Sequence, residues 1–385
     1  MEVYENEPFQ LSATDVAGLR LVVGGNLARH MEGWLVRRLI GHIKLPSGEV
    51  LHIRSRKCTA ASTLTWAAYC DPSLASLRFL GNVDYLGGAG DLAAVAARLF
   101  AHELLRAAST NGLARHYERR FVVASAVRGR IDFSRMARNG GQLVPTPSVV
   151  WERTPNTPEN RFLAAALKIV AADEVMSQAC VAELPRLHSL LAGVAPHVEP
   201  TLLAGVSPLS RNARHLETAV ALGRLLVRGA QLDEGVTTIG AAFLINIELL
   251  FERTVAQGFR EAGAPSIQKC PVRFRETRPE RTLTRAMELD LFVTQSPHGA
   301  LVVDAKYKTA ISSSNLQQMV TYCYLTGSRR AFLVVPAGHV PLATYKFAGP
   351  GVTEIVVCVV ELNTDATDVD GWRRASRAMV ASVLS

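Results

Sequence analysis

The chain has 385 residues, of which 48% are hydrophobic and 20% are charged. This length predicts two or three domains with a full hydrophobic core, and the composition excludes wholesale disorder and a collagen-like polymer. The 42 Lys and Arg residues exceed the 34 Asp and Glu residues, which gives a net charge of +8. Because arginine, whose planar side chain suits phosphate, carries most of the excess, a polyanionic partner is favoured.

Signals for secretion, membrane insertion and cysteine chemistry are missing from the sequence. Glu2, Glu5 and Glu7 stand where a secretory leader would be basic and then apolar, so we expect a cytoplasmic protein. The longest uncharged apolar stretch, residues 236–247, has about half of the roughly 20 residues that a membrane helix needs, so no membrane contact is expected. The six cysteines lie far apart, without a CxxC pair or a histidine at zinc spacing, which predicts reduced thiols.

The first part of the chain is predicted to be rich in β-structure. Residues 18–23 are short and apolar, and residues 41–45 and 50–53 flank a Pro-Ser-Gly turn, which predicts a hairpin. A helix is expected from about Asp91, whose side chain is suited to cap its first turn. Two further extended pieces are predicted at 121–127 and 129–133.

The rest of the chain is predicted to be helical at first and then to mix helices with strands. A turn and cap sequence at 154–159 leads into a helix, and further helices are predicted at 181–192, 213–229 and 241–262. Strands are predicted at 267–274, 287–294, 300–305, 331–335 and 355–359, with helices at 315–325 and at the C-terminus. We therefore expect an α/β protein, α+β overall, in three parts: 1–150, 151–240 and 241–385.

The sharpest candidate site lies in two consecutive strands of the C-terminal part. Asp290 interrupts one apolar strand and Asp304 interrupts the next, across a tight turn at 296–299. Strands joined in this way can pair antiparallel, which places the two acids side by side, with Lys306 facing the same way as Asp304. Carboxylates suit hard cations such as Mg²⁺, so the pair could hold a metal against a phosphodiester while Lys306 steadies the attacking water or the scissile phosphate.

A simpler interpretation is that Asp290 lies at a strand edge and that Asp304 and Lys306 form a surface ion pair. Two acids and a lysine at this spacing arise by chance in many chains. The surrounding residues favour a catalytic or metal-binding role for the two acids. Residues 289–293 and 301–303 are strongly apolar, and an unpaired carboxylate is costly to bury there.

Asp290 and the run Asp304-Ala305-Lys306-Tyr307 resemble the PD-(D/E)XK nuclease core of the McrC family, the nuclease subunits of McrBC-type restriction systems specific for 5-methylcytosine. Residues 128–133 and 156–162 also resemble segments typical of this family. The resemblance therefore extends over roughly residues 110–335. It implies a restriction-endonuclease-like domain, with a mixed central sheet flanked by helices, at 241–385. It also implies a region at 1–150 that docks on a partner, followed by a helical middle segment.

The resemblance assigns roles to these residues and to two helices. Asp290 and Asp304 would bind Mg²⁺, with Mn²⁺ as an alternative, and Lys306 would orient or activate water. Glu252, in the helix before the strands, would complete the metal site, and Gln318, in the helix after them, would orient Lys306 or a phosphate.

Each helix residue also has a plainer interpretation. Glu248 lies one turn before Glu252 and is an alternative helix acid, and either glutamate could be an exposed charge. Gln318 and Tyr322, four residues apart, could simply pack against each other on one helix face.

Basic residues concentrate in two runs. Residues 115–138 contain seven arginines, and residues 269–285, directly before the Asp290 strand, contain six Lys or Arg residues. Phosphate contacts in the second run would position a duplex over the metal, whereas the first run is equally suited to an acidic protein surface. Either run could also be a solvated face. The predicted DNA contacts are Lys269, Arg273, Arg275, Arg278, Arg281, Arg285 and Lys308.

The sequence contains no GxxxxGK[ST] motif, so the chain is not itself a P-loop NTPase. The resemblance implies a separate McrB-like AAA+ GTPase, so that GTP acts only through this partner, and it implies modified double-stranded DNA as the substrate. We therefore predict a Mg²⁺-dependent DNA endonuclease subunit of an antiviral restriction system. Two alternatives stay open: a non-catalytic adaptor that binds and stimulates an AAA+ NTPase, and a free-standing repair or RNA nuclease.

Overall fold

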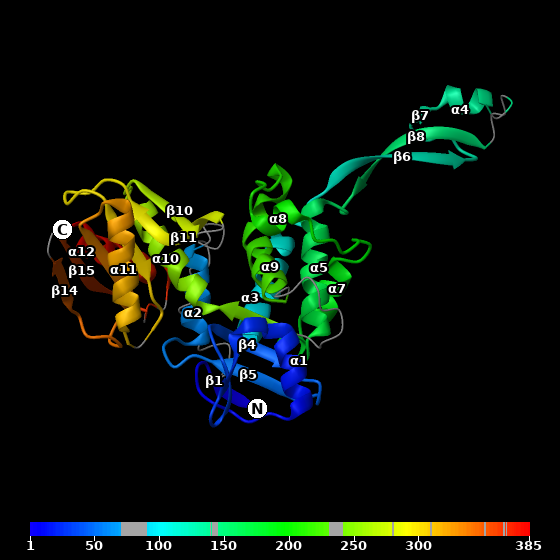
Figure 1. Cartoon of the computed structure of the whole chain (residues 1–385). Helices are drawn as coiled ribbons and strands as arrows, with labels where there is room; N and C mark the ends of the chain where they lie inside the picture. The colour runs from blue at the N-terminus through cyan, green and yellow to red at the C-terminus, as the bar shows by residue number, and fades with distance from the viewer. Residues whose placement is uncertain are drawn as a thin grey trace. The chain divides into compact units, whose positions relative to one another are not determined.

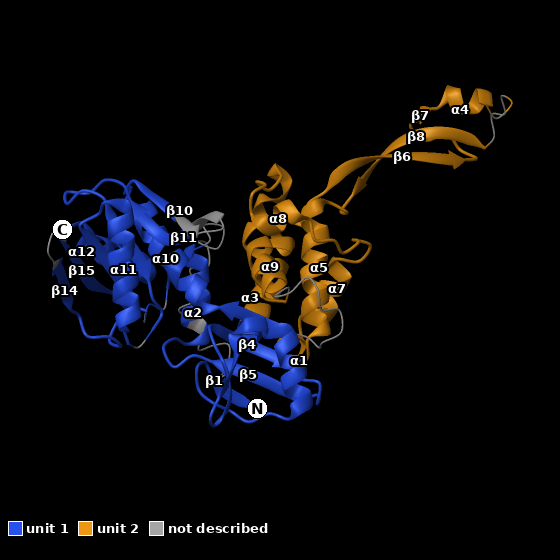
Figure 2. Ribbon diagram, viewed as in Figure 1, with its two compact units in different colours: residues 1–95, 231–385 blue, residues 96–230 orange. Residues whose placement is uncertain are grey.

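The computed structural model describes residues 1–70, 91–138, 140, 145–230, 242–278, 281–308, 310–349, 352–364, 366 and 368–385. Side chains are described for these residues except 61, 273–278, 281–285, 349, 352 and 353. The chain forms two compact units (Figure 2). Unit 1 comprises residues 1–95 and 231–385, and unit 2 comprises residues 96–230.

The first sheet of unit 1 has the strand order β1-β5-β4-β9. Its strands are β1 Glu2–Tyr4, β4 Leu39–Lys44, β5 Val50–Arg54 and β9 Ala242–Asn246. β4 and β5 pair antiparallel, which confirms the predicted hairpin, while β1 runs parallel to β5. Between β1 and β4 in the chain lie the 3-10 helix η1 Gly24–Asn26 and the strand pair β2 Leu27–His30 and β3 Gly33–Val36.

Helix α1, Ala13–Val23, packs on this sheet and shows that the strand predicted at 18–23 was wrong. Ser12 begins the helix, because its side chain accepts a hydrogen bond from a backbone amide of the first turn at 3.1 Å. Leu19 and Val23, one helical turn apart, are buried in the same hydrophobic cluster as Leu51 of β5. The apolar run therefore packs at helical spacing, and the capping serine is the signal that distinguishes it from a strand.

The second sheet of unit 1 is mixed, with the strand order β10-β11-β12-β13-β15-β14. Its strands are β10 Ser266–Arg278, β11 Arg281–Val293, β12 Leu301–Ala305, β13 Arg330–Pro336, β14 Thr344–Gly349 and β15 Val352–Leu362. β10, β11 and β12 are antiparallel neighbours, whereas β12, β13 and β15 are parallel. Helix α11, Ser313–Thr326, lies against β12, β13 and β15 (Figure 1). This mixture of sheets and helices confirms an α+β protein.

The helix predicted at 241–262 is shorter in the structure. Its first residues form β9, which is hydrogen-bonded to the edge of β4. Asn246 then caps helix α10, Ile247–Glu261, by accepting a hydrogen bond from the Leu249 amide at 3.0 Å. Pairing with β4 thus decides the conformation of a short apolar segment that local pattern alone leaves ambiguous.

Helix α2, Ala60–Cys70, packs the N-terminal part of the chain against the C-terminal part. Trp66 stacks on Trp372 of the terminal helix α12, Val369–Leu384, with ring centroids 4.8 Å apart. The Trp372 indole donates a hydrogen bond to the Thr65 hydroxyl at 2.9 Å. Both indoles are fully buried, so they form a core shared by the two ends of the chain.

Unit 2 combines helices with a three-stranded sheet. The helices are α3 Leu92–Asn111, which begins in unit 1, α4 Phe133–Arg138, α5 Pro158–Ala172, α6 Glu174–Ala179, α7 Leu184–Leu190, α8 Pro200–Ala204, η4 Arg211–Leu216 and α9 Glu217–Ala230. The strands, in the order β6-β8-β7, are β6 His116–Ala124, β8 Thr146–Thr154 and β7 Arg130–Ile131. Asp91 caps α3 as predicted. Within the described ranges of the chain, no helix is both long and apolar enough to cross a membrane.

The compact units place residue 150 inside unit 2, whereas the boundary expected near residue 240 lies close to the end of unit 2 at residue 230. Strand β8 runs through residue 150 and pairs with β6 along its whole length. Strand β9, just after residue 240, completes the sheet that begins at the N-terminus. Long-range strand pairing of this kind is not visible in local sequence patterns.

Truncation of Trp372 tests the shared core. We expect Trp372→Ala to destabilise unit 1 by about 3–5 kcal/mol, because it opens a cavity beside Trp66 and removes a buried hydrogen bond. Trp151, which is 64% exposed, offers a matched control, and Trp151→Ala should stay within about 0.5 kcal/mol of the wild type. Urea unfolding followed by circular dichroism measures both, and equal effects of the two truncations would contradict the proposed core.

Candidate active site

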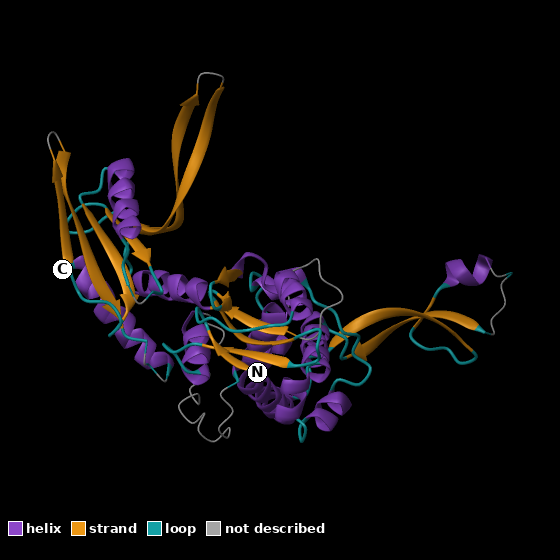
Figure 3. Ribbon diagram, turned by 60° about the horizontal axis from the view of Figure 1, so that its bottom comes forward, coloured by secondary structure: helices purple, strands orange, loops and turns teal. Residues whose placement is uncertain are grey.

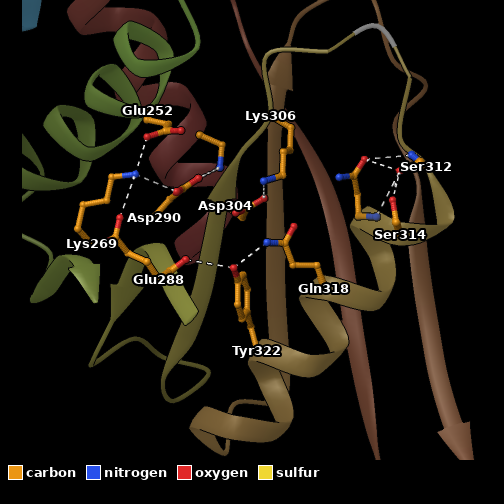
Figure 4. A network of polar contacts seen from close by, with 12 residues as sticks. Glu252, Lys269, Glu288, Asp290, Asp304, Lys306, Ser312, Ser314, Gln318 and Tyr322 are labelled. Atoms are coloured by element: carbon orange, nitrogen blue, oxygen red, sulfur yellow. Dashed lines mark hydrogen bonds and ion pairs between the residues drawn. The ribbon is translucent and has the colours of Figure 1, made fainter. Parts of the chain in front are cut away.

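The two strand aspartates face each other as the sequence predicts. β11 and β12 pair antiparallel with Leu291 opposite Val303, so Asp290 and Asp304 come next in the same register. The Asp290 carboxylate also accepts a hydrogen bond from the Ala305 amide at 3.0 Å (Figure 4). Backbone pairing therefore fixes the separation of the two acids.

Asp304 is the most buried acid of this site, with a relative exposure of 2%. It belongs to a strand whose five residues are all buried, and its carboxylate lies 2.7 Å from the Lys306 ammonium. Burial raises the pKa of Asp304 to about 7, against the opposing effect of Lys306. Although burial opposes its charge, Lys306 has a raised pKa because of Asp304.

Glu252 joins the acids through a second lysine. The Lys269 ammonium lies 2.6 Å from a carboxylate oxygen of Glu252, 3.3 Å from one of Asp290 and 3.7 Å from one of Glu288. These contacts outweigh partial burial and raise the pKa of Lys269 to about 12. The other helix acid, Glu248, instead forms an ion pair with Arg38 at 2.9 Å. The structure therefore brings Glu252, and not Glu248, into the acidic cluster.

Gln318 lies on α11 beside the aspartates and is held by its own helix (Figure 4). Its amide donates a hydrogen bond to the Tyr322 hydroxyl at 2.6 Å, and that hydroxyl donates to the Glu288 carbonyl at 3.1 Å. The pair at i and i+4 thus links α11 to β11. Both residues were picked out from the sequence, but the link to Glu288 was not.

Tyr307, directly after Lys306, is held by residues near the N-terminus. Its hydroxyl is 3.1 Å from the Ser55 hydroxyl, and the Lys57 ammonium lies 4.2 Å from the centre of its ring. Lys57 also donates to the Tyr307 carbonyl at 3.4 Å. Sequence reasoning missed these contacts because they join positions 250 or more residues apart and no local pattern marks them.

The predicted DNA contacts fall into three groups. Lys308 is exposed, just after β12. Lys269 is turned into the acidic cluster. The remaining positions lie on the paired backbones of β10 and β11, and their side chains are outside those that the structure describes: Arg273, Arg275, Arg278, Arg281 and Arg285.

The donor chemistry of the cluster suits a hard divalent cation. Asp290, Asp304 and Glu252 supply carboxylate oxygens, the ligands that Mg²⁺ and Mn²⁺ prefer. Two ammonium groups, of Lys269 and Lys306, already lie among these carboxylates, so the cluster attracts positive charge. In the described part of the chain, however, no three His, Cys, Asp or Glu side chains are arranged as ready ligands. A metal would therefore require the ammonium groups and carboxylates to rearrange.

Comparison with known proteins identifies the family. A family model described as "McrBC 5-methylcytosine restriction system component" matches residues 35–336. The chain belongs to this McrBC family. The match confirms the resemblance seen in the sequence and begins well before residue 110, where that resemblance began. No curated protein sequence matches the chain.

Two solved structures of McrBC assemblies resemble this family member. One is a chain in the refined half-complex from a tetradecameric assembly of Thermococcus gammatolerans McrB AAA+ hexamers with bound McrC; it has a TM-score of 0.65 and 15% identity, over 100% of this chain and 99% of that chain. At this identity the likeness shows a shared fold. The other, from the cryo-EM structure of the Thermococcus gammatolerans McrBC complex, has a TM-score of 0.48 and 16% identity, over 70% of this chain and 89% of that chain.

The raised pKa of Asp304 predicts a specific pH dependence of stability in the metal-free protein. The folded-state pKa, about 7, lies above the ordinary value of 3.8. The folded protein therefore keeps a proton that the unfolded chain loses, and this stabilisation is complete below about pH 4 and lost as the pH rises through about 7. Asp304→Asn removes the titration, so its stability relative to the wild type should increase between these pH values, by at most about 1.4 kcal/mol per pH unit.

Urea unfolding in the presence of a chelator, at several pH values, measures this difference. Glu354→Gln is the matched control, because it removes an exposed carboxylate from β15 of the same sheet and leaves the Asp304 cluster intact. A stability difference between Asp304→Asn and the wild type that is the same at every pH would contradict the buried titration.

Proposed function

We propose that the chain is the metal-dependent DNA endonuclease subunit of a modification-dependent restriction system and acts together with a McrB-like AAA+ GTPase. The observation that carries this proposal is the buried Asp304, opposite Asp290 and 2.7 Å from Lys306. Burying a carboxylate costs folding free energy. A buried carboxylate with a raised pKa beside a lysine therefore favours a role in catalysis or metal binding. Membership of the McrBC family supplies the biological setting.

Each residue of the site has a distinct role in phosphodiester hydrolysis. Asp290, Asp304 and Glu252 would hold Mg²⁺, or Mn²⁺ in its place, which when bound neutralises charge on the phosphate. Lys306, anchored by Asp304, donates a hydrogen bond to the attacking water or to a phosphate oxygen. Gln318, fixed through Tyr322, orients Lys306 or the same phosphate. The site thus presents positive charge and donors where negative charge develops as the P–O bond breaks.

The ribbon formed by β10 and β11 supports DNA as the substrate. β12 pairs with β11 only through residues 291–293, whereas β10 and β11 stay paired as far as Arg278 opposite Arg281. Most of this ribbon therefore extends beyond the sheet as two strands (Figure 3). It carries the second basic run, so its arginines would contact the phosphates of double-stranded, modified DNA leading to the cluster at its base.

The surface of the unit 2 sheet supports the proposal that this chain binds a protein partner. β6 and β8 present the exposed aromatic side chains of Tyr117, Phe121 and Trp151, and the Arg135 guanidinium lies 4.5 Å from the centre of the Phe121 ring. Exposed aromatic residues beside arginine are typical of protein interfaces. We assign this surface, most of which lies in the expected docking region at 1–150, to the AAA+ partner. GTP hydrolysis and recognition of the modified base would act through that partner.

A cleavage assay tests the nuclease. Methylated and unmethylated plasmids are incubated with the chain, a McrB-like GTPase, GTP and Mg²⁺. We expect cutting of methylated DNA by the wild type and a loss on the order of a thousandfold in Asp304→Asn, because the buried acid anchors both metal and Lys306. Glu252→Gln should also lose activity, whereas Glu248→Gln, which removes the same charge one turn away, should cut normally.

The other outcomes separate the alternatives. Normal cutting by Asp304→Asn would overturn the assigned site. Stimulation of GTP hydrolysis without cutting by the wild type would favour the adaptor, and cutting without partner and nucleotide would favour a free-standing nuclease.

The salt dependence of DNA binding tests the ribbon. The double variant Arg278→Gln/Arg281→Gln should bind DNA more weakly, and the slope of log affinity against log salt should fall by roughly 0.9 for each phosphate that the ribbon no longer neutralises. Arg29→Gln/Arg37→Gln removes the same charge from exposed positions of the first part of the chain and should keep the wild-type slope. Equal slopes in all three proteins would exclude the ribbon end from the DNA interface.

A further inference from the structure

Lys269 occupies an unusual place for a lysine in a basic run. Its ammonium lies within 4 Å of three carboxylates, two of which, Glu252 and Asp290, belong to the acidic cluster assigned to the metal. Figure 4 shows the ammonium between these carboxylates, at the base of the ribbon. A cation therefore already stands where the carboxylates of α10 and β11 converge.

The backbone at Lys269 is strained. Its φ of +52° lies in the left-handed region, although the residue is not glycine and lies inside a strand. This conformation is unfavourable for a residue with a side chain and persists only where the surrounding structure holds it. At Lys269, the contacts of the ammonium group with the three carboxylates contribute to holding this conformation. The strain therefore favours a change of backbone conformation at Lys269 when the carboxylates bind another cation.

An ammonium group that already lies against these carboxylate oxygens opposes the binding of a divalent cation to the same groups. Glu252 is 2.6 Å from Lys269, which is a full charge-assisted hydrogen bond. A divalent cation that binds Glu252 and Asp290 therefore competes with the ammonium, because the two positive charges repel each other at this range. Once displaced, Lys269 belongs to the basic ribbon, where a DNA phosphate is a suitable partner.

We propose that Lys269 is a built-in competitor of the divalent cation, holding Glu252 and Asp290 in the metal-free protein and leaving them when metal and DNA bind. This inference rests on the proposed function. Because a phosphate that captures Lys269 removes the competitor, DNA raises the affinity for metal, and metal raises the affinity for DNA by the same factor. The site therefore binds the divalent cation weakly until DNA is present.

Calorimetric titration of the full chain with Mn²⁺ alone tests the competition without measuring cleavage. Lys269→Gln should bind Mn²⁺ at least about tenfold more tightly than the wild type, because a charge close to the ion is removed. Lys269→Arg keeps the charge and should bind Mn²⁺ as the wild type does. Lys346→Gln is the matched control, since Lys346 also pairs with a glutamate on the same sheet, at 3.9 Å, and should leave the affinity unchanged.

Unchanged or weaker Mn²⁺ binding by Lys269→Gln would overturn the inference, as would equal tightening in Lys346→Gln. Asp304→Asn separates this result from the proposed function. If Asp304→Asn binds Mn²⁺ as the wild type does, the metal site itself is wrongly assigned. If Asp304→Asn loses Mn²⁺ and Lys269→Gln gains nothing, only the role of Lys269 fails.

A second measurement uses the wild-type chain and does not depend on the folding of a variant. Reductive methylation of lysines is followed by mass spectrometry with and without Mn²⁺. Because its carboxylate partners shield the Lys269 nitrogen, methylation there should rise severalfold when Mn²⁺ is added, while methylation of Lys346 stays constant. Methylation of Lys269 that is unchanged by saturating Mn²⁺ would overturn the displacement.

Discussion

The carboxylate of Asp304, held away from water at the end of β12, is the constraint that organises this protein. Its strand is buried along its whole length and lies between β11 and β13, so the acid cannot turn outward without breaking the sheet. Any negative charge on it must be balanced from within, by a proton or by the ammonium of Lys306 at 2.7 Å. A cationic side chain is therefore part of the fold at this position, which agrees with the metal site proposed above.

The two ends of the chain cooperate to keep this strand in place. Tyr307, just beyond it, contacts Trp66 and Phe251 through its ring and Ser55 through its hydroxyl. Trp66 in turn stacks on Trp372 of the terminal helix. Segments from the first, middle and last parts of the sequence thus meet behind the strand that carries the candidate site. Residues whose rotamers are fixed by such packing hold a site in position better than residues on free loops.

Local sequence patterns predicted the parts of the fold that depend on neighbouring residues. The hairpin of β4 and β5, the cap at Asp91 and the facing acids of β11 and β12 all follow from turn chemistry and strand alternation. The failures involve distant partners: residues 18–23 pack as a helix, 242–246 pair with β4, and Lys269 turns toward Asp290. The last was accessible in principle, since the antiparallel register of β10 and β11, with Arg278 opposite Arg281, brings Lys269 level with Asp290. Predicting that register would have required knowing that both strands extend through the basic run.

The order of the segments along the chain has a consequence for synthesis. Unit 2 interrupts unit 1, so α2 and the edge of β4 are made long before α12 and β9, which cover them. During translation, Trp66 and the edge of β4 stay uncovered while unit 2 is synthesised. Unpaired edges and uncovered aromatic residues promote association of nascent chains. The packing behind the candidate site is therefore completed only after α12 has been synthesised, and a chain without α12 would leave Trp66 open to association with other chains.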